Sequence, residues 1–472
     1  MAVALLSPGV LIREVDLTVG RAENVLDNIG GICGPFQKGP VDDPYTVETE
    51  QELIEEFGKP ISTDAQYEYW MSASSFLTYG GVLKVVRTDG ATLNNANAGV
   101  DLVSDTTLKI KNYDDYKENY QTDTGWNYAA KTPGKWANGL KLCFIDDLAD
   151  QTVGVTTTSL AGMGVTIGYG VTVGLSSIVI PDATTGTIST ITTGFLKGIV
   201  TGVKTDANSG DSSFDVKWTH RVNAVGVGST AVRIAYAKND PAASLSVGST
   251  VQSDDNIFFN KADGSVANSS IYSSGVDAKT AVDWYDQQQL PITNGTVFWK
   301  AIAPRPVSNN YVTERQGYND GMNICIVDDE GTVTGIQGNI VEKFNSLSKA
   351  LDAVSSVNAP QKVWYKDFLA DFSEYAYAGF NPSNDEDSYW GTVPRATGFS
   401  THFTPYTTAE GLWGQNAQGI TYAALGNVGY GFSGGVDYSS TGGMKATLGD
   451  LITSYNLFKN KEEVAVDYLI MG

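Results

Sequence analysis

The clearest hydrophobic pattern in the chain lies between Gly30 and Arg87. It opens with a short apolar run around Ile32 and Cys33, which predicts a strand, and it closes with the apolar run 82–87, which predicts a second strand. Two helical segments are predicted between these strands. The order strand, loop, helix, helix, strand is typical of one unit of an α/β sandwich.

Each of the two helices has its own start and stop signals. Thr49 and Glu52 fit a capping box, so the first helix is predicted to begin there and to end at Gly58. Asp64 is predicted to cap the second helix, and Gly80 is predicted to end it. The residues expected to share one face of the second helix are Tyr67, Trp70, Met71 and Ser74.

The first 20 residues contain an extended, β-prone segment that has no purely apolar side. Its two sides would carry Leu11, Arg13, Val15 and Leu17 on one face and Val10, Ile12, Glu14 and Asp16 on the other. A lone strand with unpaired backbone groups tends to associate unless something pairs with it. On the residues alone, the segment either pairs within its own chain or adds to a sheet in a neighbouring subunit.

Residues 150–300 have a different character. They are rich in Gly, Thr, Ser and Val, and short runs of alternating apolar and polar residues are separated by turn signals. No helix is predicted there before Lys279. This pattern predicts an all-β insertion, either a barrel or a sandwich.

Residues 301–472 return to a mixed pattern. A hairpin is predicted from a strand at 323–327, a tight turn at 328–331 and a return strand at 332–336. The helical spacing of the next apolar residues predicts an amphipathic helix. These residues are Ile340, Phe344, Leu347, Leu351 and Val354.

Shorter elements are predicted elsewhere. Residues 108–111, 140–145 and 363–365 are predicted to form strands, and 462–470 a buried strand near the end of the chain. A helix is predicted before that last strand because five apolar residues share one face. They are Leu448, Leu451, Ile452, Tyr455 and Phe458.

Charge and cysteine content exclude several classes of protein. The net charge of −22 would repel a phosphate backbone or an anionic membrane surface, which argues against both as partners. Cys33, Cys143 and Cys325 form no disulfide framework and are expected to be buried free thiols. His220 and His402 are the only histidines, so a His-rich metal site is excluded. No cofactor and no metal site is predicted.

No apolar run approaches the ~20 residues that a membrane span needs, and the N-terminus is a poor signal peptide.

One motif of catalytic type is present. The run 431–435 matches G-x-S-x-G, which would make Ser433 a nucleophile. That motif needs a helix directly after it and a histidine later in the chain, and the sequence provides neither. There is no P-loop, and the acidic cluster 385–387 lacks EF-hand spacing. We therefore predict that the chain is not an enzyme and has no catalytic residue.

Several segments together carry a resemblance. In order along the chain they include Ser7-Pro8-Gly9-Val10, Gly39-Pro40, Phe57-Gly58, the run 80–87, the Pro-Gly-x-x-x-Asn-Gly turn before residue 140, Gly338 with Glu342 and Phe344, Leu347–Lys349 and the turn 429–437. Their order and spacing resemble those of tail sheath proteins of contractile-tailed, myovirus-type bacteriophages. The resemblance covers residues 7–90, 131–146 and 321–472 in pieces.

The resemblance implies a structural protein of the virion. Sheath subunits form a helical lattice of hexameric rings around the tail tube, and their contraction drives the tube through the host envelope for genome ejection. The implied partners are further copies of the chain, the tail tube protein, the baseplate and the tail terminator, with assembly in the host cytoplasm. It also favours strand exchange between subunits by the N-terminal arm, through Val10, Leu11, Ile12, Arg13, Glu14, Val15, Asp16 and Leu17.

The expected fold is a multidomain α/β (α+β) chain with a discontinuous sandwich core. Its parts are an N-terminal linking arm at 1–20, a first core part with a linker at 21–149, a β-rich outer insertion at 150–300 and a second core part at 301–472. The family's C-terminal domain would begin where this chain stops, so a fragment or an unusually short member is expected. Two alternatives remain: a β-rich adhesin-type protein that recognises a surface glycan, and a hydrolase built around Ser433.

Overall fold

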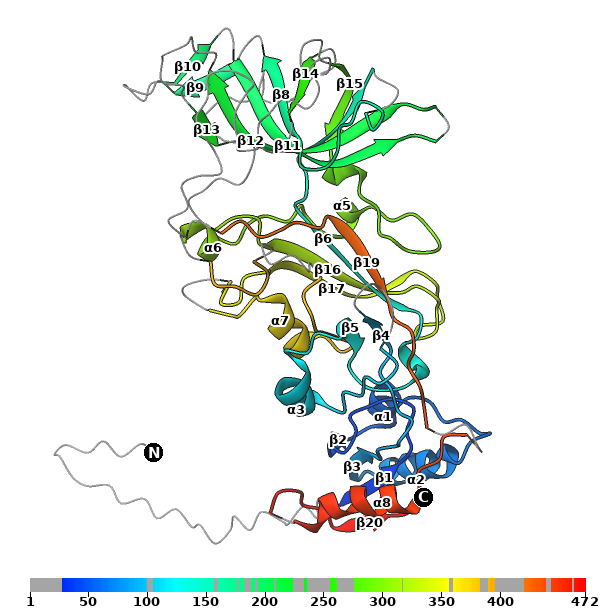
Figure 1. Ribbon diagram of the computed structural model, residues 1–472. Coiled ribbons are helices and arrows are strands. Elements are labelled where there is room, and N and C mark those ends of the chain that lie inside the picture. The colour runs from blue at the N-terminus through cyan, green and yellow to red at the C-terminus, as the bar shows by residue number, and fades with distance from the viewer. Residues whose placement is uncertain are drawn as a thin grey trace, which may run out of the picture. The chain divides into compact units, whose positions relative to one another are not determined.

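The computed structural model describes the chain from residue 28 to its end, with gaps (Figure 1). Besides 1–27, the residues outside the description are 100–104, 157–159, 176–177, 182–187, 192–193, 208, 224–232, 236–254, 261–275, 316, 356–359, 383–388, 395–419, 439–442 and 461. The chain forms two compact units, Met1–Leu93 with Asp437–Gly472 and Asn94–Val436. Both contain strands and helices, so the predicted mixed α/β class is confirmed.

The first unit is built on a four-stranded sheet in the order β2-β3-β1-β20. β3 and β20 run parallel to the central strand β1, and β2 runs antiparallel to β3. The strands are β1 (Ile29–Gly34), β2 (Tyr45–Val47), β3 (Val82–Arg87) and β20 (Tyr468–Ile470). The helices are α1 (Glu50–Phe57), α2 (Gln66–Thr78) and α8 (Leu448–Tyr455), which continues into the 3-10 turn η6 (Asn456–Lys459).

Alternate residues of the central strands face opposite apolar clusters in this unit. Ile32 and Val85 pack with the buried side chains of α1 and α2, whereas Cys33 and Val86 pack with Phe458 of η6. The sheet therefore lies between two apolar layers, as its period of two requires. The predicted order of strand, two helices and strand is confirmed, with the short strand β2 added.

The start signal was right for one helix and wrong for the other. Thr49 caps α1 and forms the predicted reciprocal pair with Glu52, and Gly58 ends the helix at a positive φ of 86°. The N-cap of α2 is Ala65, and no side chain caps it, so the assignment of Asp64 was wrong. The buried face of α2 also differs from the prediction, since Tyr67 and Met71 are more than one third exposed. The buried residues of α2 are Gln66, Trp70, Ala73, Ser74 and Leu77.

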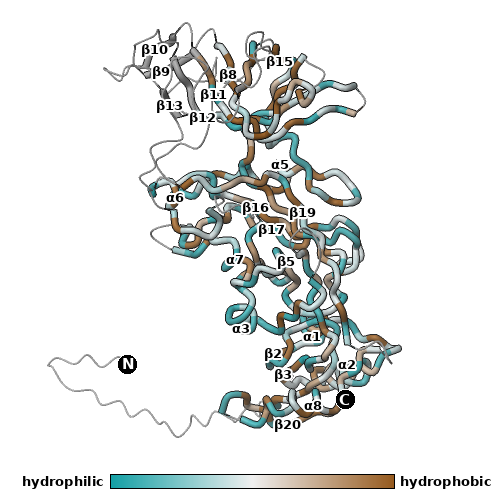
Figure 2. Tube along the Cα trace, in the orientation of Figure 1, coloured by the Kyte–Doolittle hydropathy of each residue, from teal (hydrophilic) through white to brown (hydrophobic). Residues whose placement is uncertain are grey.

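The second unit contains a four-stranded antiparallel sheet in the order β17-β16-β6-β19. Its strands are β6 (Leu140–Asp146), β16 (Gly321–Asp328), β17 (Asn339–Ser348) and β19 (Asn427–Gly431). A three-stranded sheet of β4 (Asn97–Gly99), β5 (Trp126–Ala130) and β18 (Ala376–Ala378) belongs to the same unit. In Figure 2, apolar residues concentrate on the strands and hydrophilic residues on the connecting loops.

Short helices connect these strands. They are α3 (Tyr113–Asp115) with the π-helical turn η2 (Tyr116–Tyr120), the 3-10 turns η3 (Lys135–Ala137) and η4 (Tyr285–Gln287), and the α-helices α5 (Trp299–Ile302), α6 (Asn310–Glu314) and α7 (Tyr365–Phe372). The predicted strand at 140–145 is confirmed as β6. The predicted strand at 363–365 was wrong, because Trp364 makes only an isolated bridge with Ser348 and Tyr365 begins α7.

The predicted amphipathic helix that begins near Ile340 is the clearest error. Residues 339–348 instead form β17, in which Phe344 pairs with Ile324 and Ile340 with Val327 of β16. Two register shifts interrupt this pairing, so the buried positions lose the simple alternation that would identify a strand. Of the other residues of the proposed helix face, Leu347 lies in β17, while Leu351 and Val354 lie beyond it.

The hairpin was right in kind but not in its bounds. The predicted return strand at 332–336 is part of the turn, because the buried Asp328 carboxylate accepts the backbone amides of Thr332, Val333 and Thr334. These bonds occupy the amide groups that a strand would have used, so the return strand starts only at Asn339.

Two further strand predictions were wrong in whole or in part. Residues 108–111 form no strand; the Asn95 side chain bonds the backbone amide and carbonyl of Ile110 instead. In the predicted buried strand 462–470, only Tyr468–Ile470 is a strand, and Tyr468 and Leu469 are each 55% exposed.

Six strands between Gln151 and Asp283 close into an antiparallel barrel. Their order is β11-β8-β14-β15-β7-β12, and β12 also pairs with β11, which closes the ring. The strands are β7 (Gln151–Val155), β8 (Gly170–Leu175), β11 (Gly194–Thr205), β12 (Ser212–Asn223), β14 (Asn256–Asn260) and β15 (Val276–Asp283); the short strands β9 (Ile178–Pro181), β10 (Ile188–Ile191) and β13 (Arg233–Ala235) lie outside the ring. Alternate apolar residues such as Val171, Val173, Phe214 and Val216 form one buried cluster.

Candidate functional site

The predicted arm residues Val10 to Leu17 lie outside the described residues, so their role in subunit contacts stays a prediction. The acidic cluster 385–387 and His402 also lie outside the description. Within the part of the chain that the structure describes, no group of three or more His, Cys, Asp or Glu residues is placed to hold a metal ion.

Ser433 lacks the setting of a nucleophile. It is exposed, and its backbone pairs with Asn97 in an isolated bridge. The next described helix, α8, begins only at Leu448, whereas a nucleophile elbow turns directly from strand into helix. The described residues after Ser433 therefore do not form the strand-to-helix turn of a nucleophile elbow.

The three cysteines are free and buried, as predicted. Burial raises the pKa of Cys33 and Cys143 far above the ordinary thiol value and raises that of Cys325 to about 12. A thiol with so high a pKa carries almost no thiolate near neutral pH, which makes it a poor nucleophile.

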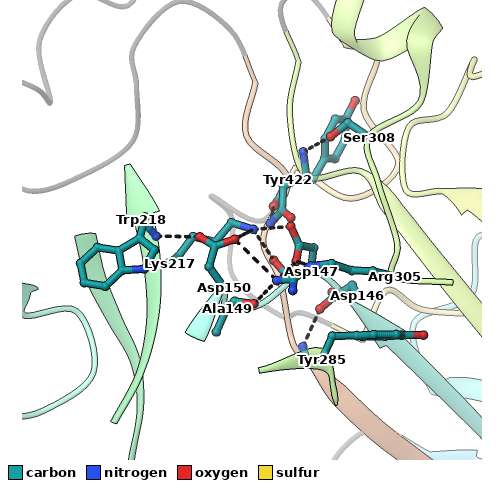
Figure 3. A network of polar contacts seen from close by, with 12 residues as sticks. Asp146, Asp147, Ala149, Asp150, Lys217, Trp218, Tyr285, Arg305, Ser308 and Tyr422 are labelled. Atoms are coloured by element: carbon teal, nitrogen blue, oxygen red, sulfur yellow. Dashed lines mark hydrogen bonds and ion pairs between the residues drawn. The ribbon is translucent and has the colours of Figure 1, made fainter. Parts of the chain in front are cut away.

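A cluster of charged side chains lies where the barrel joins the four-stranded sheet (Figure 3). The chain leaves β6 through Asp147 and Asp150 to enter the barrel, and it returns from β15 through Asp283. Lys217 comes from β12, and Arg305 follows α5. We call these five residues the junction cluster.

Arg305 contacts both segments in which the chain passes between the sheet and the barrel. We call the segment after β6 the outgoing crossing and the segment after β15 the returning crossing. Its Nε donates to Asp147 Oδ1 at 2.8 Å, and its Nη1 donates to Asp283 Oδ1 at 2.9 Å. Its Nη2 donates to the carbonyl of Ala149. One planar guanidinium thus binds the outgoing crossing through two residues and the returning crossing through a third, which a lysine ammonium cannot reproduce in the same geometry.

Lys217 brings a barrel strand into the same cluster. Its ammonium donates to the Asp147 carboxylate and lies 3.7 Å from Asp150 Oδ1. Asp150 Oδ2 accepts the backbone amide of Trp218 at 2.8 Å, and the Asp150 carbonyl accepts the amide of Trp284 at 3.1 Å. Asp150 therefore connects β12 to the segment that follows β15.

Burial and charge act in opposite directions on the two acids of the outgoing crossing. Burial raises the pKa of Asp150 above the ordinary carboxyl value, and the neighbouring Asp147 charge adds to that rise despite Lys217. Burial also opposes ionisation of Asp147, but Lys217 and Arg305 outweigh it and hold its pKa below the ordinary value. The cluster contains three carboxylates and two cations. Each cation therefore has at least one carboxylate partner.

A second buried pair lies beside this cluster. Asp146 and Lys349 approach to 2.8 Å, and neither side chain is exposed. Asp146 also accepts the amides of Leu425 and Gly426, and the Lys349 ammonium donates to the carbonyl of Ala423 at 2.9 Å. The pair thus fixes the start of β19 against the ends of β6 and β17.

The first unit exposes an apolar groove of about 380 Å³ instead of a polar cluster. Leu448 and Ile452 of α8 line it together with Leu469 and Met471 at the end of the chain. These four side chains are each more than half exposed. The predicted helix face is therefore present in α8, but a large part of it is not buried.

Comparison with known proteins gives two curated relatives. The chain is 37% identical over 97 residues to the tail sheath protein of Enterobacteria phage T4, and 36% identical over 95 residues to that of Vibrio phage KVP40. Part of this chain is related to phage tail sheath proteins. The matched segments are 20% of this chain but only 14% and 13% of those relatives. No family model matches the chain.

Solved structures of sheath tail proteins are also among the matches. One from Desulfitobacterium hafniense has 12% identity and a TM-score of 0.17, with 48% of this chain and 35% of that chain covered. One from Listeria innocua has 10% identity and a TM-score of 0.16, with 54% and 34% covered. Superpositions this poor add no weight to the sequence relationship.

Sequence reasoning did not find the junction cluster. The sequence shows the adjacent acids Asp146 and Asp147, but their positions in the chain do not place them relative to any partner. A usable signal was present, because adjacent acidic residues at the exit of an apolar strand need basic partners when they are buried.

None of the described helices has the length and apolar content of a membrane span.

Proposed function

We propose that this chain is a structural subunit of a phage contractile tail sheath. The single observation that carries the proposal is the 37% identity over 97 residues to the T4 tail sheath protein. The segments that resemble those of sheath proteins also support it. In this role the chain acts without catalysis, in the virion tail, after assembly in the host cytoplasm.

The subunits polymerise with one another in hexameric rings around the tail tube, and their contraction drives the tube through the host envelope. The further partners are the tail tube, baseplate and tail terminator proteins. Because the sequence contains no P-loop, the work of contraction comes from the lattice itself. An extended lattice formed at assembly is held by a kinetic barrier and relaxes once, by rigid movements at the subunit contacts.

Residues 1–20 act as the linking arm in this proposal, and Val10 to Leu17 add as a strand to a neighbouring subunit. Residues 21–149 and 301–472 form the core, and residues 150–300 form an outer insertion that contains the barrel. An added strand of this length makes about six backbone hydrogen bonds of roughly 1 kcal/mol each, which is substantial when repeated through a lattice.

Electron microscopy of the purified full chain tests the proposal. Helical sleeves or stacked rings are expected, and they should form more readily when the tail tube protein is present. Dispersed single particles at all concentrations, with and without the tube protein, would contradict it.

A deletion tests the arm separately. Removing residues 1–18 should abolish the sleeves and leave the thermal unfolding midpoint unchanged. The matched control keeps the length and composition of the arm but scrambles the order of residues 10–17, and it should also fail to assemble. Normal assembly of the deletion variant would rule out the arm as the link.

A further inference from the structure

The barrel and the four-stranded sheet have separate apolar interiors. The barrel cluster includes Val153, Phe214 and Trp218, and the cluster on the nearby face of the sheet includes Ile145 and Trp284. The two clusters share no residue. Among the described residues the barrel and the sheet therefore have separate apolar cores, and the side-chain contacts that hold the two chain crossings are polar.

The crossing groups are those of the junction cluster. Arg305 binds the outgoing crossing through Asp147 and the returning crossing through Asp283. Lys217 joins the barrel strand β12 to Asp147, which Arg305 also holds. The Arg305 side chain is 17% exposed, and those of Asp147, Lys217 and Asp283 are 22%, 30% and 31% exposed, so these contacts are partly shielded from water and salt.

We propose that the junction cluster is an ionic lock that fixes the barrel on the four-stranded sheet, with Arg305 as its central positioning residue. With the lock closed, the barrel and the sheet move as one body. Without the guanidinium, the barrel keeps its two covalent crossings and, among the described contacts, those of Lys217 and Asp150, and it pivots about the crossings. Barrel and sheet each keep their own fold, because neither apolar cluster contains Arg305.

Hydrogen–deuterium exchange of the full chain, read by mass spectrometry, tests this lock. In Arg305→Met, the junction amides of Trp218 and Trp284 should exchange about tenfold faster or more, since they depend on the position of Asp150. Amides in β8 of the barrel and β16 of the sheet should keep their rates within about twofold. Lys300→Met is the matched control, because Lys300 and its partner Asp286 are both about half exposed, and it should change nothing.

A milder variant covers the case in which Arg305→Met does not fold. Asp283→Asn keeps the shape of the side chain and removes one charge pair from the returning crossing, and it should speed exchange at Trp284 more than at β8. Two results would overturn the proposal. Unchanged junction exchange in both variants would mean that there is no lock, and equal acceleration in junction, barrel and sheet would mean that Arg305 only supports the overall fold.

Discussion

A buried ion pair in the second unit and an exposed apolar groove in the first unit form the clearest contrast between the two units. The first unit leaves large apolar side chains at its surface, with Leu448 at 74% and Met471 at 75% exposure. The second unit buries charged side chains, with Asp146 and Lys349 both at 0%. Every charge of the buried pair is matched, whereas the apolar groove has no partner within the described residues. The contrast teaches that the buried pair serves the internal order of its unit, whereas the groove presents apolar side chains to solvent.

The largest effect should come from breaking the buried pair of the second unit. Asp146→Ala leaves the Lys349 ammonium buried without its carboxylate, so the free energy of unfolding should fall by about 3–5 kcal/mol. Urea denaturation followed by tryptophan fluorescence measures this. The double variant Asp146→Leu with Lys349→Met removes both charges and should recover most of the loss. A loss below about 1 kcal/mol in the single variant would mean that the pair does not organise the unit.

The next effect concerns a buried lysine of the same unit. Lys366 in α7 is 7% exposed and has no ion pair with any described residue. Burial lowers the pKa of Lys366 from 10.5 to about 8. The unfolded chain therefore binds more protons than the folded chain between these values, and stability rises with pH across that interval.

Lys366→Met removes this penalty and should raise the free energy of unfolding at pH 7 by up to roughly 3 kcal/mol. It should also flatten the rise in stability above pH 8. Urea denaturation at several pH values, compared with the exposed control Lys343→Met, measures both effects. If the pH dependence of the free energy of unfolding is the same in Lys366→Met, the Lys366 ammonium is solvated in the folded protein and the prediction is wrong.

A smaller effect is expected at the helix cap of the first unit. Thr49→Ala removes the side-chain acceptor for the amide of Glu52 and should cost about 1 kcal/mol. The control Ser75→Ala, at an exposed position inside α2, should cost nothing. Thermal unfolding resolves the two. Equal midpoints would show that the capping box contributes nothing to the unit.

The smallest effect on stability should come from the apolar groove. Leu448→Ser combined with Ile452→Ser should change the free energy of unfolding by less than about 0.5 kcal/mol, because both side chains are largely exposed. The same variant should bind less of a hydrophobic dye and sediment with less self-association. A large loss of stability would mean that the groove is part of the core, which would remove the contrast between the units.

Features that depend on residues close together in the sequence could be predicted, and features that depend on distant residues could not. Thr49 and Glu52 are three positions apart, so the capping box could be predicted from local spacing. The pairing of β17 with β16 could not be predicted in the same way, because its register shifts disguise the strand period and the spacing of Ile340 and Phe344 also fits a helix.

The junction cluster is harder still to predict from sequence. Lys217 lies 70 positions from Asp147, and Arg305 lies 158 positions from it. No local pattern connects them, and only closure of the barrel brings β12 back to the start of β7. The resemblance to sheath proteins could be predicted because the turns and apolar runs that carry it can be read from a single sequence. The contacts of residues 10–17 stay a prediction.

Gold-labelled antibodies raised against the purified chain, applied to intact virions, test the sheath role most directly. Electron microscopy should show label along the whole length of the tail, with the spacing between labels reduced after contraction. Label confined to fibres or to the tail tip would contradict the sheath role and favour a glycan-binding protein.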